Sequence, residues 1–334
     1  KLSGINLVYL RSMSSQALTA SIIIRCFNEE KHIGKLLTGI QQQKLDDIEI
    51  ILVDSGSTDA TLSIARQFPV HILSIKPENF SFGRALNIGC EEANGKYLVM
   101  ASAHVYPTFD DWLERLLEPF ENPDVALTYG KQRGNGTTKF SEHQIFKRWF
   151  PDQSDFSQDT PFCNNANAAI RRQLWQEQPY DEQLTGLEDL DWAKKILNRG
   201  YKLAYAAEAE IIHVHEETPQ QTRMRYYREA LAMSEMYPDQ KFNLFDLIRL
   251  WIQNTLHDYR AALKTNQLIQ NLWAIPEFRL MQFWGTWQGY NQRSQLPAHL
   301  KRRFYYPPET NPRTDVNRQE HKSRRIQYDK LTDV

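Results

Sequence analysis

The sequence predicts an α/β protein whose mostly parallel, twisted sheet is flanked by helices and followed by a helical C-terminal extension. Between residues 21 and 107, short β-branched runs alternate with helical patterns, which is typical of βαβ units. Three of the apolar runs lead straight into polar residues. From about residue 218 the pattern is helical only, with many Arg, Tyr and Trp residues and no further βαβ unit.

Polar residues follow three apolar strands at the point where each strand ends. The three sequences are Arg25-Cys26-Phe27-Asn28-Glu29, Asp54-Ser55-Gly56-Ser57 and Ser102-Ala103-His104. In a parallel α/β sheet, ligands bind outside the carboxyl ends of the strands. We therefore expect the three strand ends to form one binding site.

The other elements follow from hydrophobic spacing and capping residues. Ile33, Leu36, Leu37 and Ile40 are spaced i, i+3, i+4, i+7, which predicts an amphipathic helix after the first strand. Ser57-Thr58 should cap a second helix that begins at Asp59. The same criteria predict strands at 71–75, 125–129, 201–205 and 209–214, and helices at 86–93, 112–120 and 187–199. Residues 130–160, rich in Gly, Asn, Ser and Asp, are predicted to form a long functional loop.

Four segments are expected along the chain. Residues 1–19 match no element, and Met13 before a polar stretch is typical of a natural start, so we leave this segment out of the fold. Residues 20–217 should form the α/β domain, and residues 218–300 the helical extension, whose Trp and Arg residues would pack on that domain, on a second subunit or on a membrane surface. Residues 301–334 form a basic, polar tail, predicted to be poorly ordered or draped over a partner.

Composition narrows the class of protein. With 334 residues, 41% of them hydrophobic, the chain can bury a large core. A formal net charge of −1 gives no electrostatic reason to bind nucleic acid. The three cysteines have no metal-ligand spacing and favour a reducing compartment. We find neither a spanning apolar run nor a secretory signal, so we expect a cytoplasmic protein, which could work at the inner face of the membrane.

Asp54 is the most suggestive of the strand-end residues. A carboxylate in this position can accept a hydrogen bond from a ribose hydroxyl or a nucleobase imide. The Ser55-Gly56-Ser57 turn that follows lets the backbone approach a ligand at a helix start. The alternative is a capped tight turn around a solvated Asp.

The order of the motifs closely resembles that of the family 2 glycosyltransferases of the GT-A fold. The motifs are Cys26-Phe27-Asn28-Glu29, Val53-Asp54-Ser55-Gly56-Ser57-Thr58-Asp59, Asn87-Ile88-Gly89, Ser102-Ala103-His104, Tyr180-Asp181-Glu182, Leu187-Glu188-Asp189-Leu190-Asp191, Gly200-Tyr201 and His213-Val214-His215. The resemblance covers about residues 20 to 216. It implies a GT-A-type sheet and the transfer of a sugar from a nucleotide-sugar donor to a saccharide or lipid-linked saccharide acceptor, with inversion.

The resemblance also implies roles for individual residues on the donor side. Asn28, Glu29 and Asp54 would hold the base and ribose, with Ser57, Ser102 and Ala103 beside them. Arg84 would lie near the base, or it is an ordinary surface cation. Asn164 and Asn167, in Cys163-Asn164-Asn165-Ala166-Asn167, resemble the loop that lines the donor sugar and the acceptor, although an Asn-rich turn is an equally simple interpretation.

Asp189 resembles the family's catalytic base, with Glu188 beside it. In the inverting reaction the base takes the proton of the acceptor hydroxyl as that hydroxyl attacks the anomeric carbon. A general base must be ionised, and we expect the dipole at the helix start to keep Asp189 ionised. The alternative is a plain helix N-cap.

The sequence departs from the family pattern at Ser102-Ala103-His104. Most relatives have Asp-x-Asp there, and its carboxylate binds the divalent cation that bridges the two phosphates. His104, with His213 and His215, could replace it by an imidazole-rich site, which would suit Mn²⁺ better than Mg²⁺. The alternatives are direct donation from His104 to a phosphate, or a structural histidine.

Two other functions fit parts of the pattern. A sugar-nucleotide nucleotidyltransferase shares an α/β nucleotide-binding half, but it would require a Gly-rich phosphate loop directly after the first strand, where this chain has Cys26-Phe27-Asn28-Glu29. A catalytically impaired nucleotide- or saccharide-binding protein would explain the missing carboxylates. The presence of Glu188-Asp189 argues against that second reading.

Overall fold

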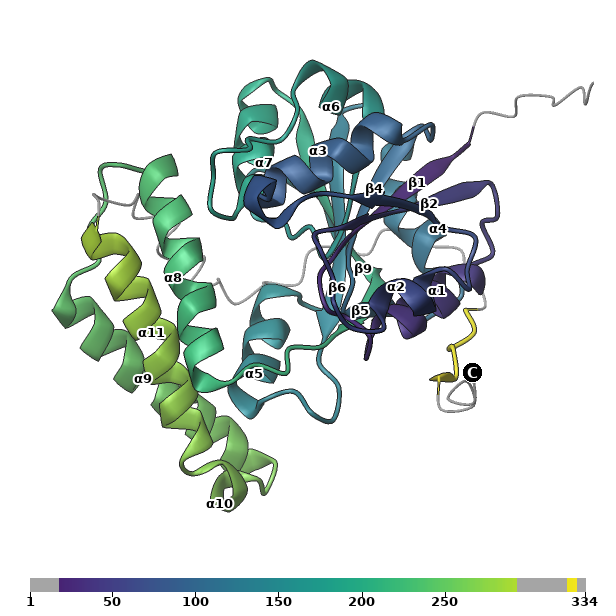
Figure 1. The fold of residues 1–334 in the computed structure, drawn as a ribbon. Coiled ribbons are helices and arrows are strands. Elements are labelled where there is room, and N and C mark those ends of the chain that lie inside the picture. Colours follow the sequence, from purple (N-terminus) through teal and green to yellow (C-terminus); the bar gives the residue numbers. More distant parts are fainter. Residues whose placement is uncertain (1–17, 293–322, 329–334) are drawn as a thin grey trace, which may run out of the picture.

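A computed structural model describes residues 18–292 and 323–328. Within them, one nine-stranded sheet has the order β3-β2-β1-β4-β8-β6-β9-β5, and β7 pairs with β9 (Figure 1). The strands are β1 Ala20–Cys26, β2 Ile48–Asp54, β3 His71–Ser74, β4 Tyr97–Ser102, β5 Val105–Pro107, β6 Val125–Arg133, β7 Asp155–Gln158, β8 Asn167–Arg171 and β9 Lys202–His213.

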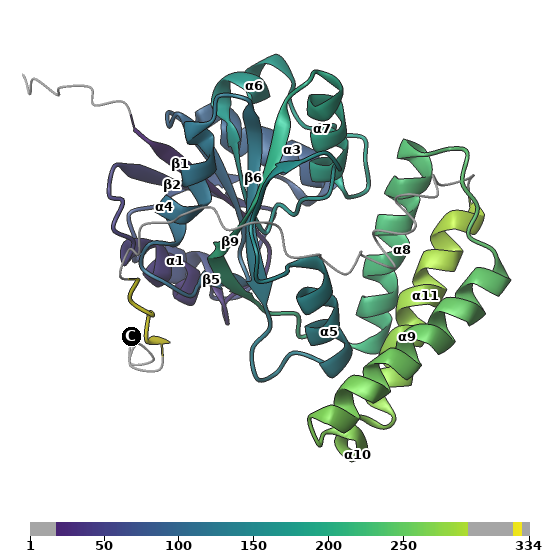
Figure 2. The same cartoon turned by 180° about the vertical axis from the view of Figure 1, so that it is seen from behind.

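The helices cover both faces of the sheet and then form a separate group beside it (Figures 1 and 2). They are α1 Ile33–Gln41, α2 Thr61–Ala65, α3 Phe82–Glu92, α4 Trp112–Leu117, α5 Phe140–Trp149, α6 Arg172–Glu177, α7 Glu188–Asn198, α8 Pro219–Met236, α9 Leu244–Lys264, α10 Leu268–Asn271 and α11 Ala274–Gln292, with the 3₁₀ turns η1 Pro77–Asn79 and η2 Glu118–Glu121. The predicted α/β fold with a helical C-terminal region is confirmed.

The sheet is parallel in its N-terminal half. β1 lies between β2 and β4, and β2 pairs with β3, all in parallel. β8 then runs antiparallel between β4 and β6, and β5 and β7 are antiparallel to β9. The register aligns Cys26 with Asp54 and Arg25 with Ser102, so the three predicted strand ends meet at one edge.

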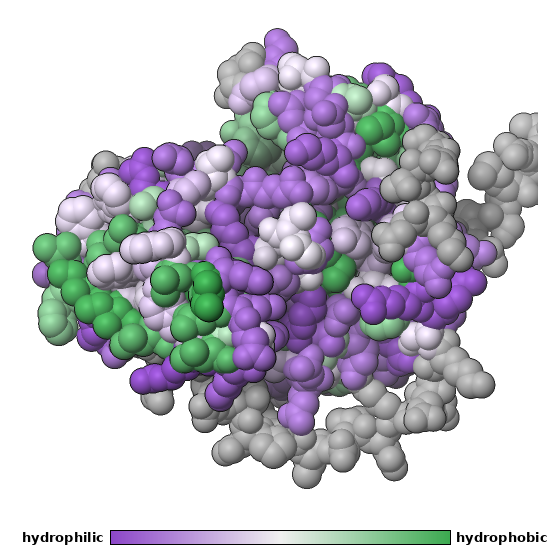
Figure 3. Space-filling view, turned by 90° about the horizontal axis from the view of Figure 1, so that it is seen from below, coloured by the Kyte–Doolittle hydropathy of each residue, from purple (hydrophilic) through white to green (hydrophobic). Residues whose placement is uncertain are grey.

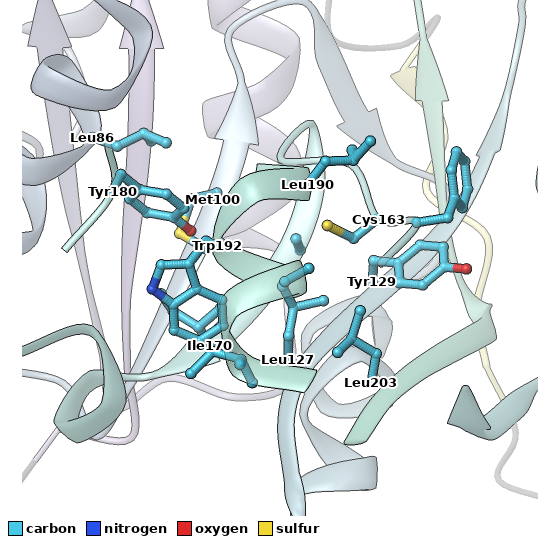
Figure 4. Close-up of a cluster of buried hydrophobic side chains, with 14 of the residues drawn as sticks. Leu86, Met100, Leu127, Tyr129, Cys163, Ile170, Tyr180, Leu190, Trp192 and Leu203 are labelled. Atoms are coloured by element: carbon cyan, nitrogen blue, oxygen red, sulfur yellow. The ribbon is translucent and has the colours of Figure 1, made fainter. Parts of the chain in front are cut away.

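Alternate residues of the central strands point into two cores. Ile22 and Ile24 belong to the cluster under α1 and α4, whereas Ile23 belongs to the cluster under α3 and α7. Figure 4 shows part of this second cluster, where Trp192 and Leu190 of α7 face Ile170 and Leu127. This alternation is the period of two that a strand imposes when both of its faces are buried.

The helical extension shares the second of these cores. Met233 of α8, Leu250 of α9 and Phe283 of α11 belong to the same buried cluster as the strands and α7. Capping boxes begin α8 at Thr218 and α9 at Asn243. The extension therefore packs against the α/β domain through a continuous apolar interface.

Three predicted elements differ from the structure. Residues 130–160 are not one long loop, because they contain the end of β6, the helix α5 and the strand β7. The second helix begins at Thr61, since Ser57 and Thr58 are engaged in hydrogen bonds to the Asn28 loop and do not cap it. The two strands predicted at 201–205 and 209–214 form the single strand β9.

A short C-terminal segment, residues 323–328, returns to the α/β domain. The Tyr328 hydroxyl donates to the carbonyl of Pro107, and the amide of Ile326 donates to the carbonyl of Thr108. Ile326 is buried, and Arg324 contacts Asp110. This part of the predicted tail is thus packed on the domain; the rest of the tail and residues 1–17 lie outside the described residues.

The described helices include none that combines the length and the apolar character needed to cross a membrane. Cys26, Cys90 and Cys163 are free thiols, and all three are buried. Burial raises the pKa of the Cys26 and Cys90 thiols well above the ordinary value, which keeps them protonated. Cys26 and Cys90 are therefore small side chains of the apolar core.

Candidate active site and imidazole cluster

Asp54 closes the turn at the end of β2. Its carboxylate accepts hydrogen bonds from the amides of Gly56, at 3.0 Å, and Ser57, at 3.2 Å. The residue is only 2% exposed, so the alternative of a solvated Asp is wrong. Gly56 has φ of +95°, a backbone conformation that glycine adopts without strain. The turn thus holds a buried carboxylate at the edge where the strand ends meet.

Asn28 joins this turn to the end of β1. Its amide donates to Ser57 Oγ at 2.9 Å, and its Oδ1 accepts from the amide of Thr58 at 2.8 Å. The left-handed conformation of Asn28, with φ of 53°, points both groups toward the turn. Asn28 and Ser57 therefore fix the loops around Asp54, and both remain exposed enough to meet a ligand.

A second group of charged residues lies at the start of α7. Arg25, on β1, donates to Glu188 Oε1 at 2.8 Å, and the Asn165 side chain donates to the same oxygen at 3.4 Å. The Arg25 guanidinium also lies 5.0 Å from the centre of the Phe82 ring. The pair is largely buried, so each charge depends on the other for compensation.

Asp189 lies beside this pair and accepts two backbone hydrogen bonds. The amides of Asn165 and Leu190 each lie 2.9 Å from its carboxylate. Burial, and secondly the neighbouring Glu188, raise the pKa of Asp189 to about 7. The expectation that the helix dipole keeps this group fully ionised is therefore wrong, because desolvation outweighs the two amides. A carboxyl poised near neutrality suits a general base.

Pairing of β5 with β9 brings three histidines together. Val105 lies opposite His213, and the carbonyl of His104 accepts from the amide of Val214. The ring centres of His104 lie 5.1 Å from His213 and 5.5 Å from His215, which are themselves 4.1 Å apart. One ring nitrogen from each of the three lies within 4.8 Å of the others.

Each of these imidazoles has an oxygen acceptor on its Nδ1. The partner of His104 is Glu29, and that of His215 is Glu142. The Nδ1 of His213 lies 2.7 Å from Gln132 Oε1. A carboxylate or amide oxygen only accepts, so Nδ1 carries the hydrogen and Nε2 keeps its lone pair, as in the outer shell of metal sites.

The Nε2 atoms of the cluster have the properties of metal ligands. Burial lowers the pKa of His213 and His215 well below the ordinary value, and the next largest cause is the neighbouring His215 for His213 and Arg225 for His215, so both rings are neutral. His213 Nε2 is buried and has no hydrogen-bond partner among the described residues. An orphaned, unprotonated nitrogen beside two others fits a divalent transition metal.

Two predicted donor residues lie in the core. Asn167 is completely buried; its Oδ1 accepts from Trp112 Nε1, and its Nδ2 donates to the carbonyls of Ala209 and Lys131. Its amide is satisfied, so the assignment to the donor site is wrong. The Ala103 side chain is buried in the apolar cluster under α1, which leaves only its backbone near the site.

The remaining predicted residues are near the surface of the site. Ser102 ends β4 and is partly exposed. Asn164 accepts from the amide of Ala166 and shapes the loop that carries Asn165. Arg84 is exposed on the first turn of α3.

The sequence interpretation missed two supporting residues. Gln132 on β6 and Glu142 on α5 orient His213 and His215, and both lie in the segment predicted as a loop. A signal was present, because Glu142 stands in the acidic first turn expected of a helix. The contacts themselves span 81 and 73 residues, a separation that local patterns do not reveal.

Known proteins resemble this chain over the α/β domain. Residues 21–177 match the sequence model of glycosyl transferase family 2. The O-antigen chain rhamnosyltransferase RfbN of Salmonella typhimurium is 26% identical over 220 residues, which are 62% of this chain and 70% of RfbN. The O-antigen chain rhamnosyltransferase WbaN of Salmonella anatum is 28% identical over 56% of this chain and 63% of its own length.

Solved structures share the fold at low sequence identity. The mannosyltransferase PcManGT of Pyrobaculum calidifontis, in complex with GDP-Man and Mn²⁺, has a TM-score of 0.56 at 19% identity over 81% of this chain and 84% of its own. GalNAc-T7, with UDP, GalNAc and Mn²⁺, has a TM-score of 0.51 at 18% identity over 67% of this chain and 49% of its own. Residues 21–177 thus belong to a family 2 glycosyltransferase domain of the GT-A fold, and the chain is a glycosyltransferase.

Proposed function

We propose that this glycosyltransferase moves a sugar, with inversion, from a nucleotide-sugar donor to a saccharide or lipid-linked saccharide acceptor. The observation that carries the proposal is the carboxyl of Asp189, held by two amides and with its pKa raised to about 7 beside the Arg25–Glu188 pair. It provides a proton acceptor that is half ionised at neutral pH.

Asp189 acts as the general base. It takes the proton of the acceptor hydroxyl while the oxygen forms a bond to the anomeric carbon and the bond to the nucleoside diphosphate breaks on the opposite face. Glu188 remains paired with Arg25 and raises the proton affinity of Asp189 through its charge. Glu188 is therefore a positioning residue in this mechanism, and the proton moves to Asp189 alone.

The edge around Asp54 holds the nucleoside. The buried Asp54 carboxylate is kept at the strand end by two amides, where an unused lone pair can accept from a ribose or base donor. Asn28 and Ser57 form the loops around it, and the resemblance assigns Ser102, Arg84 and Asn164 to the same donor. The GDP-Man present in PcManGT and the UDP present in GalNAc-T7 support this class of donor.

The Nε2 atoms of His104, His213 and His215 would hold the divalent cation. A bound cation would supply positive charge for the diphosphate leaving group. Three imidazole nitrogens favour Mn²⁺ over Mg²⁺, which prefers oxygen ligands. Both structural neighbours contain Mn²⁺, which supports a divalent cation as the cofactor of the transfer reaction. His104 is the most exposed of the three.

A donor screen tests the proposal directly. The full chain is mixed with UDP-, GDP-, dTDP- and CMP-sugars, a rhamnosyl nucleotide included because both relatives are named rhamnosyltransferases. Melting temperature and release of nucleoside diphosphate are measured with Mn²⁺ and with EDTA. We expect one donor class to stabilise the protein and to be consumed only with Mn²⁺. Stabilisation that survives EDTA would overturn the cation site, and binding without any turnover would overturn the enzyme mechanism.

A further inference from the structure

The helix α9 has an exposed apolar face in addition to its buried one. Leu247, Leu250 and Ala262 pack inward. After its first residue, Leu244, which is also exposed, α9 has five exposed large apolar side chains: Phe245, Ile248, Ile252, Leu256 and Leu263. We call these five residues the α9 stripe. A contiguous apolar strip on the surface of a protein marks an interaction site.

The α9 stripe is straight. Phe245 and Leu263 are 18 residues apart, about five turns at 3.6 residues per turn, so the stripe stays on one side of the helix for about 27 Å. A straight apolar face of this length can lie along a flat surface over its whole extent.

The apolar surface continues past the end of α9. Ile269 on α10 is 91% exposed, and Trp273, just before α11, is 83% exposed. In Figure 3 the apolar side chains gather over the helical extension, whereas the rest of the visible face is mainly hydrophilic. Tryptophan is enriched where a protein meets the headgroup region of a bilayer.

The exposed charges on α9 itself are positive. Arg260 and Lys264 are exposed, and the nearest exposed carboxylates, Asp239 and Glu277, lie before α9 and after α10. The two acidic residues of α9 are buried, Asp246 in its cap and Asp258 against Arg279.

A groove of about 370 Å³ adjoins the stripe. Leu256 belongs to both, and the cationic residues on its walls are Arg148 of α5 and Arg260 of α9, with His257 between them. No carboxylate is among the residues that line it in the described part of the chain. Guanidinium groups that converge on a polar hollow suit the oxygens of a phosphate.

We propose that α9 and α10 lie flat on an anionic membrane surface. The α9 stripe, Ile269 and Trp273 enter the boundary between headgroups and acyl chains, and the groove at Arg148 and Arg260 receives a lipid phosphate. A straight apolar face flanked by cations is the pattern of a helix that lies in the interface plane. This inference does not depend on the proposed catalytic mechanism.

Vesicle sedimentation with the full chain tests the proposal. Vesicles of phosphatidylglycerol mixed with phosphatidylcholine should pellet the protein, and phosphatidylcholine vesicles should pellet much less of it. The double variant Ile248→Ser/Ile252→Ser should lose about tenfold or more in vesicle affinity, since two apolar side chains no longer leave water. Met224→Ser, which removes an exposed apolar side chain from α8, should leave affinity unchanged.

Removing a positive charge from the groove tests its role in binding a lipid phosphate. Arg260→Gln should lower affinity for the anionic vesicles about fivefold and leave the affinity for neutral vesicles unchanged. Arg66→Gln, an exposed cation on the α/β domain, is the matched control and should have no effect. Added salt should weaken the wild-type interaction with anionic vesicles.

Each other outcome contradicts the proposal. Equal binding to neutral and anionic vesicles would overturn the role of the cations, and no binding to either would overturn the membrane surface. Light scattering, which measures the mass of the particle, tests whether a second copy of the chain covers the stripe instead of a membrane. If the wild type is a dimer that Ile248→Ser/Ile252→Ser dissociates, the face is an interface between copies and the proposal is wrong. Melting temperatures of the variants exclude misfolding as the cause.

Discussion

The carboxylate of Glu29 lies 2.8 Å from the Nδ1 of His104. The sequence assigns Glu29 to the base and ribose of the donor, yet in the structure its oxygen orients an imidazole. Glu29 thereby connects the strand end of β1 with the histidine cluster at the start of β5. This contact joins the proposed nucleoside side of the site to its proposed cation side.

Replacing Glu29 should weaken the cation site more than the nucleoside site. We expect Glu29→Ala to lower Mn²⁺ affinity by about tenfold to a hundredfold, because His104 loses the acceptor that fixes its ring and its tautomer. Calorimetric titration of the purified protein with Mn²⁺ measures this. Glu30→Ala is the control, since its carboxylate contacts the amide of Ala60 and no imidazole. Equal Mn²⁺ affinity in wild type and Glu29→Ala would contradict the assignment.

Changing His104 to a carboxylate should change the preferred metal. The three imidazoles should bind Mn²⁺ and discriminate against Mg²⁺, because Mg²⁺ requires oxygen ligands. His104→Asp supplies such an oxygen at the same strand end. We expect Mg²⁺ to raise the melting temperature of His104→Asp but not that of the wild type. A wild type stabilised equally by Mg²⁺ and Mn²⁺ would show that the cluster does not hold the cation.

Asp189 should control the pH dependence of transfer. Its carboxyl must be ionised to accept a proton, and its pKa is raised to about 7. We expect kcat/KM to be constant above this pKa and to fall about tenfold for each pH unit below it. Asp189→Asn should lose about a thousandfold in rate while donor binding remains. Unchanged turnover in Asp189→Asn would refute the assignment of the base.

Ionisation of Asp189 should lower the free energy of unfolding at neutral pH. The folded-state pKa of about 7 lies above the ordinary value of 3.8, so the folded protein binds this proton more tightly than the unfolded chain does. The stability that the protonated carboxyl contributes is present below pH 3.8 and is lost as the pH rises toward 7. Asp189→Asn should therefore melt at a higher temperature than the wild type at pH 8, and the difference should shrink at pH 4.

The sequence predicts the residues at the strand ends of this site, but it does not predict the residues that orient the histidines. Asp54 and Ser102 are found because parallel strands end at a common edge, a rule that local patterns can use. The acceptors Gln132 and Glu142 depend on contacts between β6, α5 and the end of β9, which no local pattern encodes.

Burial explains the assignments that failed. Asn167 has the residue type of a ligand-binding loop, but it lies on β8 at the centre of the sheet. There its side-chain amide accepts a hydrogen bond from Trp112 and donates to two carbonyls. The ionisation of Asp189 depends on how deeply it is buried, and a helix-start position alone does not reveal that. In both cases tertiary packing, which is absent from the sequence pattern, decides the chemistry.

The Arg25–Glu188 pair should behave as a unit that tunes Asp189. Arg25→Gln leaves the largely buried Glu188 carboxylate without its cation, and we expect a loss of about 3 kcal/mol in unfolding free energy. Because the Arg25 charge also lowers the pKa of Asp189, its removal should move the acidic limb of the pH profile to higher pH. Denaturant unfolding and a kcat/KM profile measure the two effects.

A double variant separates this coupling from simple damage to the fold. In Arg25→Gln/Glu188→Gln both charges are absent, so neither is left buried alone, and most of the lost stability should return. The two changes act on the pKa of Asp189 in opposite directions, since Arg25 lowers it and Glu188 raises it. The acidic limb of the double variant should therefore lie below that of Arg25→Gln. If the stabilities of the single variants simply add in the double variant, the two side chains are not coupled.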